Sequence, residues 1–162
     1  MLPVLFAACA DPSDPPPEAA CVPASEAEIL ERRGDYYRCL DRTLQDGAGC
    51  GPDGYPLGYG AKYADRYFDD AYPRLTDAGQ AFFRAVSPCL QERMAAEVAP
   101  DWTCAEVWDH GFDTHLGCYL DAGFCGIPGS DVVEIAGVLD PEDSALPEVA
   151  DLFVALTEAC SG

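Results

Sequence analysis

The sequence contains no asparagine and only one lysine, Lys62, among its 162 residues. Without asparagine the chain has no acceptor for an N-linked glycan. Acidic residues outnumber basic ones 29 to 9, which gives a formal net charge of −20. A surface of this charge repels nucleic acid and anionic lipid, so we expect neither as a partner. It favours cationic partners or loosely held divalent ions, although the simplest interpretation of the charge is solubility outside the cell.

Closely spaced cysteine pairs are also missing, although the chain has nine cysteines. Zinc and haem sites need pairs such as C-x2-C, so neither is expected. Dispersed cysteines in a domain of this size indicate a disulfide framework made in an oxidising compartment. The cysteines are Cys9, Cys21, Cys39, Cys50, Cys89, Cys104, Cys118, Cys125 and Cys160.

No stretch of eighteen apolar residues occurs, so no segment is predicted to span a membrane. The apolar start, MLPVLFAAC, places two alanines before Cys9, as in the lipobox of bacterial lipoproteins. Phe6 stands where leucine is usual and no basic n-region is present, so the match is partial. We predict a signal remnant over 1–9 with Cys9 as the lipidated residue, which would be the only contact with a membrane. Setting Cys9 aside leaves eight cysteines, enough for four disulfides.

Residues 10–24 contain five prolines and no apolar period, which predicts an extended tether. The remainder, 25–162, is predicted to be one helical domain, because apolar residues recur at helical spacing and alternating strand patterns are absent. At Ser87-Pro88 the pattern allows either a kink or a new helix. The fold class is therefore all-α, a disulfide-stapled bundle of about five to six helices. The expected helices cover 26–45, 60–72, a segment opening at Thr76 and continuing to Val98, a segment opening at Thr103 and passing Tyr119, 131–139 and 146–160, with a glycine-rich loop over 47–60.

Three segments resemble the stanniocalcins, a family of secreted, cysteine-rich helical glycoprotein hormones. RCLDRTLQDGAGCG (38–51) resembles the family's opening, and LTDAGQAFFRAVSPCL (75–90) resembles its D-x-x-G-x-A-F segment. CYLDAGFCGI (118–127) resembles a C-Y-x5-C-x-I element. The spacing C-x13-C-x6-C-x34-C from Cys104 to Cys160 also agrees with the family pattern, and the resemblance covers about residues 38–160.

The resemblance implies disulfides Cys89–Cys118 and Cys125–Cys160. The family partners of Cys39, Cys50 and Cys104 are missing here, and Cys21 is a candidate replacement. Four cysteines allow three pairings, and the sequence does not choose among them. Cys39–Cys50 with Cys21–Cys104 is favoured, because Cys50 lies in a glycine-rich return after the first helix.

The resemblance implies a secreted, non-enzymatic module that acts by contact with an extracellular protein. Lipidation at Cys9 would instead anchor the module at a bacterial surface. Family members exert hormone-like control of calcium and phosphate handling, and some inhibit a large secreted metalloprotease. No cofactor and no contact residue is implied. A second hypothesis is a purely structural surface lipoprotein without a specific partner.

A third hypothesis is a metal-dependent enzyme that uses His110 and His115, which have aspartates nearby. A five-residue offset places the two about 140° apart on a helix, unlike the i, i+4 pair of a zinc protease. A solvated polar face is therefore the favoured interpretation, and no metal site is expected. The acidic turns 140–143 and 69–70 offer weak calcium binding at most. The tyrosines at 59, 63 and 67 form a stripe that favours core packing over a ligand platform.

Overall fold

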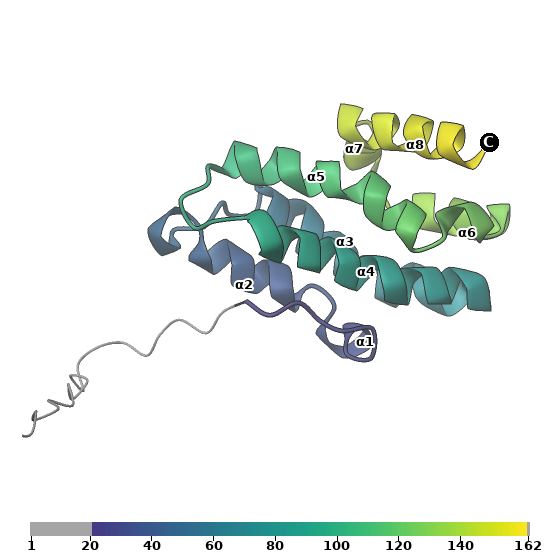
Figure 1. The fold of residues 1–162 in the computed structure, drawn as a ribbon, viewed down its shortest axis with the longest axis horizontal. Coiled ribbons are helices and arrows are strands. Elements are labelled where there is room, and N and C mark those ends of the chain that lie inside the picture. Colours follow the sequence, from purple (N-terminus) through teal and green to yellow (C-terminus); the bar gives the residue numbers. More distant parts are fainter. Residues whose placement is uncertain (1–20, 162) are drawn as a thin grey trace, which may run out of the picture.

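Two long antiparallel helices, α4 (Asp77–Glu97) and α5 (Cys104–Asp121), run side by side through the middle of the molecule (Figure 1). The structure, a computed structural model, describes residues 21–161. In these residues it is all-α, with no strand. Helix α2 (Asp35–Thr43) lies on one side of the pair, and α8 (Pro147–Cys160) packs along α5 on the other. The remaining α-helices are α1 (Ile29–Arg32), α3 (Lys62–Arg66), α6 (Gly129–Ala136) and α7 (Pro141–Ser144).

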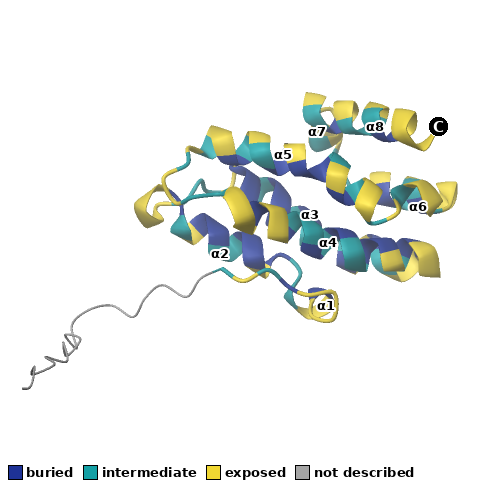
Figure 2. Cartoon of the chain, in the orientation of Figure 1, coloured by how far each residue is buried: buried dark blue, intermediate teal, exposed yellow. Residues whose placement is uncertain are grey.

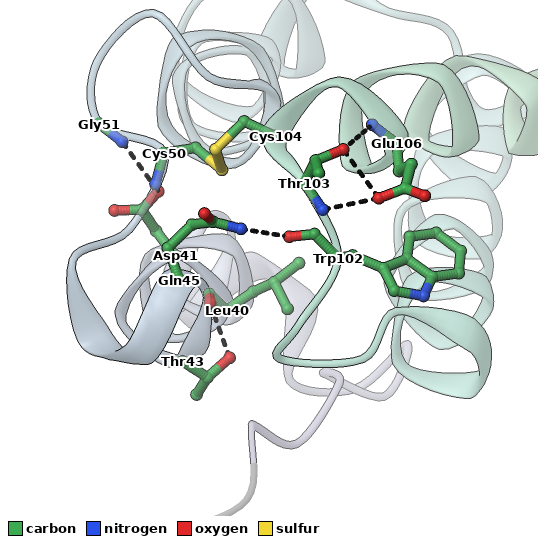
Figure 3. Close-up of a disulfide and its surroundings, with 10 residues drawn as sticks. All are labelled: Leu40, Asp41, Thr43, Gln45, Cys50, Gly51, Trp102, Thr103, Cys104 and Glu106. Atoms are coloured by element: carbon green, nitrogen blue, oxygen red, sulfur yellow. Dashed lines mark hydrogen bonds between the residues drawn. A yellow bond between two sulfur atoms is a disulfide. The ribbon is translucent and has the colours of Figure 1, made fainter.

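The start of α5 follows directly from its sequence. The Thr103 hydroxyl accepts a hydrogen bond from the Glu106 amide, and the Glu106 carboxylate accepts one from the Thr103 amide at 2.7 Å (Figure 3). This predicted capping box satisfies two amides that have no partner within the helix. At the start of α4, the Thr76 hydroxyl accepts a hydrogen bond from the amide of Gly79, without the reciprocal bond of a capping box. Helix α4 then continues through Pro88, so the alternative of a new helix at Ser87-Pro88 is wrong.

The predicted helix 26–45 is interrupted. Arg33 has a φ of 40°, which ends α1, and α2 begins two residues later. The chain after the break packs closely on the segment around Ala61: a Cβ at Gly34 would lie 2.8 Å from the carbonyl oxygen of Ala61. The Gly34 amide donates to the carboxylate of Asp65 instead of to a helical carbonyl. The helical period continues across the interruption, which is why the sequence pattern did not reveal it.

The predicted loop over 47–60 is too long at its C-terminal end. Helical turns begin at Tyr55 and continue as π-helix Tyr55–Ala61, helix α3 and π-helix Tyr67–Ala71. Glycines here serve close packing: a Cβ on Gly60 would lie 2.7 Å from the Tyr37 ring. The short helix α7 was not predicted, while α6 and α8 lie close to their expected ranges.

The core is rich in aromatic side chains. The buried faces of α2, α4 and α5 enclose it, as the dark blue parts of the cartoon in Figure 2 show. Tyr55 is central to it: its ring stacks on Tyr59 and meets the edge of Phe112. Tyr59 and Tyr63 are buried, so the tyrosine stripe belongs to the core as expected. Within residues 21–161, no helix combines the length and the apolar character needed to cross a bilayer.

Four disulfides staple the helices, with Cα–Cα separations between 5.2 and 5.7 Å. Cys89–Cys118 joins α4 to α5, and Cys125–Cys160 joins the turn after α5 to the end of α8. These are the two pairings that the stanniocalcin resemblance implies. The others are Cys21–Cys39 and Cys50–Cys104.

The favoured pairing of Cys39 with Cys50 and of Cys21 with Cys104 is therefore wrong. The Asp41 carboxylate accepts hydrogen bonds from the amides of Cys50 and Gly51, which holds their loop on one face of α2 (Figure 3). Cys39 lies two residues before Asp41, about 200° around the helix, and so projects from the opposite face. Cys50 instead meets Cys104 at the start of α5. Cys9 and the tether up to residue 20 lie outside the described residues.

Removal of a disulfide should lower the free energy of unfolding by an amount that increases with the length of the loop that the disulfide closes. Cys50–Cys104 spans 54 residues and Cys21–Cys39 spans 18. Loop-closure entropy gives about 4 kcal/mol for the first and about 3 kcal/mol for the second. We expect Cys50→Ala/Cys104→Ala to lower the free energy of unfolding more than Cys21→Ala/Cys39→Ala in urea titrations. Non-reducing peptide mapping checks the connectivity, and a Cys39–Cys50 cross-linked peptide would contradict it.

Candidate functional site

His115 belongs to the core, so the solvated polar face that the sequence favoured is wrong for this residue. It is 4% exposed, and its Nδ1 lies 2.8 Å from the carbonyl oxygen of Gly111. Since a carbonyl only accepts, Nδ1 carries the proton and Nε2 is left with a lone pair. The ring stacks on Phe112. Burial lowers the pKa of His115 to about 4, so the imidazole is neutral at physiological pH.

His110 lies in a different environment on the same helix. Its ring meets the edge of Trp102, and its Nδ1 is 3.8 Å from a carboxylate oxygen of Glu97. The two histidines thus do not form a shared site. Within the described range, no group of three or more histidine, cysteine, aspartate or glutamate side chains is arranged to hold a metal ion.

A small cavity beside His115 is lined by tyrosines from several helical segments, and its volume is about 40 Å³. That is room for roughly three waters, since one water occupies about 10–15 Å³ on this measure. Burial raises the pKa of Tyr119 to about 12, and burial likewise raises those of Tyr37 and Tyr59. The phenols therefore stay neutral, and the cavity suits water or a similarly small uncharged molecule. From the sequence, only the tyrosines at 59, 63 and 67 could be expected to lie together. The other residues that line the cavity are brought beside them by the fold.

The acidic turn 140–143 is bound to the only lysine. Lys62 Nζ lies 2.6 Å from Asp140 and 2.7 Å from Asp143, and the Tyr63 hydroxyl donates to Asp143. Arg66 adds an ion pair to Asp140 at 2.8 Å. Hydrogen bonds from Lys62 and Arg66 lower the pKa of Asp140. Residues 140–143 form the N-cap and the first three residues of α7, and the paired carboxylates of Asp140 and Asp143 hold this helix against α3. Weak calcium binding there remains a prediction.

Residues 69–70 lie in the π-helix Tyr67–Ala71 and not in a turn, and Asp69 forms an ion pair with Arg33. The disulfide cysteines, by contrast, are structural elements: Cys118, for example, is completely buried. The predicted site residues are therefore distributed through the core and along the helix contacts rather than gathered at one reactive centre.

Comparison with known proteins returned no matching family model, no matching curated protein and no matching solved structure.

The buried neutral His115 should make stability depend on pH. Its pKa is about 4 in the folded state and about 6.5 in the unfolded state, which therefore binds more protons between these values. The free energy of unfolding should fall as the pH falls from about 6.5, by about 3 kcal/mol at pH 4 from this residue. His115→Gln should remove this part of the pH dependence in urea titrations. His110→Gln, at a half-buried position on the same helix, is the matched control. Equal slopes for both variants would contradict the assignment.

Proposed function

We propose that this protein is an extracytoplasmic binding module that acts by protein–protein contact and not by catalysis. The observation that carries the proposal is the set of four disulfides, which fixes the helices relative to one another. Disulfides of this kind persist in oxidising compartments. A rigid surface loses little conformational entropy on binding, which favours a contact function.

The pairings Cys89–Cys118 and Cys125–Cys160 support a role of stanniocalcin type, because they are the pairings that the resemblance implies. A stanniocalcin-like regulator would act on a secreted protein, as the family's protease inhibitors do. The net charge of −20 favours a partner with a basic surface, and such complementarity raises the association rate.

The histidine environments favour this proposal over a metal-dependent enzyme. His115 is buried with its Nδ1 bonded to a carbonyl, and His110 faces Trp102 and Glu97. Neither arrangement offers an open coordination position shared by both rings.

A binding function predicts saturable, fold-dependent capture of a partner. The oxidised protein is immobilised and exposed to secreted proteases and membrane extracts, with reduced and alkylated protein as the control. We expect a partner that the oxidised form alone retains, that free protein displaces, and that binds the purified chain with a measurable Kd. Retention that is the same on both forms, or no retained partner, would favour the purely structural alternative.

The enzyme alternative has a separate test. His110→Ala should leave bound zinc and any hydrolytic activity unchanged, because its ring has no second ligand histidine beside it. Metal content measured by mass spectrometry gives the answer. If the unaltered chain binds zinc stoichiometrically and the variant binds less, the metalloenzyme hypothesis would be favoured over the binding module.

Anchoring through Cys9 is part of the same proposal. In a bacterial host that processes lipoproteins, the protein should fractionate with membranes, and Cys9→Ser should release it. Intact mass measurement checks for the lipid. An unlipidated Cys9 in the membrane-associated protein would contradict the anchor and leave the binding function in place.

A further inference from the structure

An arginine-lined groove lies beside the Cys21–Cys39 disulfide, on the outer face of α1 and α2. Its volume is about 420 Å³, within the usual range for small-molecule sites. Arg38 and Arg42 stand one helical turn apart on α2, on the same face as Cys39. The disulfide holds residue 22 along this face, and Arg32, at the end of α1, completes the lining.

Arg38 is already neutralised within the groove. One of its nitrogens lies 3.1 Å from the carboxylate of Asp35, and another bonds the carboxylate of Asp65. It therefore forms part of the wall, with its guanidinium held in place. Among residues 21–161, Asp35 is the acidic residue that lines the groove.

Arg32 and Arg42, in contrast to Arg38, have no close carboxylate partner among the described residues. Arg32 donates a 2.6 Å hydrogen bond to the carbonyl oxygen of Val22, which orients the guanidinium without neutralising it. Its nearest carboxylate, that of Glu28, is 3.9 Å away. Arg42 forms no ion pair with any residue of the described range, although it is exposed.

This is unusual in a chain with 29 acidic and 9 basic residues, where carboxylates are abundant. Among the other basic side chains of the described residues, Lys62, Arg66 and Arg74 have carboxylate partners at 2.6, 2.8 and 2.7 Å, respectively. Arg84 has no ion pair there, but its guanidinium donates to the hydroxyl of Tyr72. Within the part of the chain that the structure describes, Arg32 and Arg42 lack a close carboxylate and line the same groove. An external anion bound there could form charge-assisted hydrogen bonds to both guanidinium groups.

We propose that this groove binds a compact oxyanion that carries phosphate or sulfate groups. The guanidinium fork forms paired, charge-assisted hydrogen bonds to such groups. The net charge of −20 selects a compact ligand over a polymer. At physiological salt the Debye length is about 8 Å, so a small anion within the groove experiences mainly the local arginines. A long polyanion would extend over the acidic remainder of the surface and be repelled.

The test is a titration of the full chain with inorganic phosphate and pyrophosphate at constant ionic strength, with chloride as the control anion. Binding is followed through the Arg side-chain Nε–H signals in NMR spectra. We expect saturable shifts for Arg32 and Arg42, and tighter binding of pyrophosphate because it carries more charge. Arg42→Gln should weaken pyrophosphate binding at least tenfold, and Arg32→Gln/Arg42→Gln should abolish it.

The matched control is Arg74→Gln/Arg93→Gln, which removes the same charge at exposed positions that already have carboxylate partners. It should bind as the unaltered chain does. Because Arg32 also bonds the chain at residue 22, Arg42→Gln alone provides the variant that keeps this contact. Absence of saturable binding, or equal loss in the control variant, overturns the site. If a sulfated polysaccharide binds more tightly than pyrophosphate, and the binding depends on Arg32 and Arg42, the proposal that the ligand is compact is wrong.

Discussion

The structure depends on one contact, the packing of α4 against α5 with the Cys89–Cys118 disulfide across it. Cys118 is fully buried, so the bond lies within the core and not on its surface. Phe82 and Val107 supply buried apolar area along the same pair, one from each helix. Helices α2 and α8 lie on opposite sides of this pair (Figure 1), so its position determines theirs.

Charge explains why so many covalent links are needed. A net charge of −20 on 162 residues favours expansion of the chain through self-repulsion. Disulfides offset this by restricting the unfolded state, and four of them link segments that are 18 to 54 residues apart. The same imbalance makes the few arginines informative, because each one without a close carboxylate is an exception.

The buried polar groups show how the helices are positioned. The Gln91 side chain accepts from the Ala24 amide and donates to the Arg33 carbonyl, which fixes the N-terminal segment and the break between α1 and α2. Asp131 accepts from the amide and hydroxyl of Thr76, which ties α6 to the start of α4. These contacts join residues 55 to 67 positions apart and satisfy groups that burial would otherwise penalise.

The sequence by itself determined the helical class, the capped starts of α4 and α5, and the disulfide framework, because these follow from local period, local hydrogen bonds and cysteine count. Only the tertiary structure decided the partners of Cys39 and Cys50, the burial of His115 and the break at Arg33. Each of these depends on which helix face meets another segment. That choice is made by the total packing of the core, to which residues distant in the sequence contribute, and no local pattern records it.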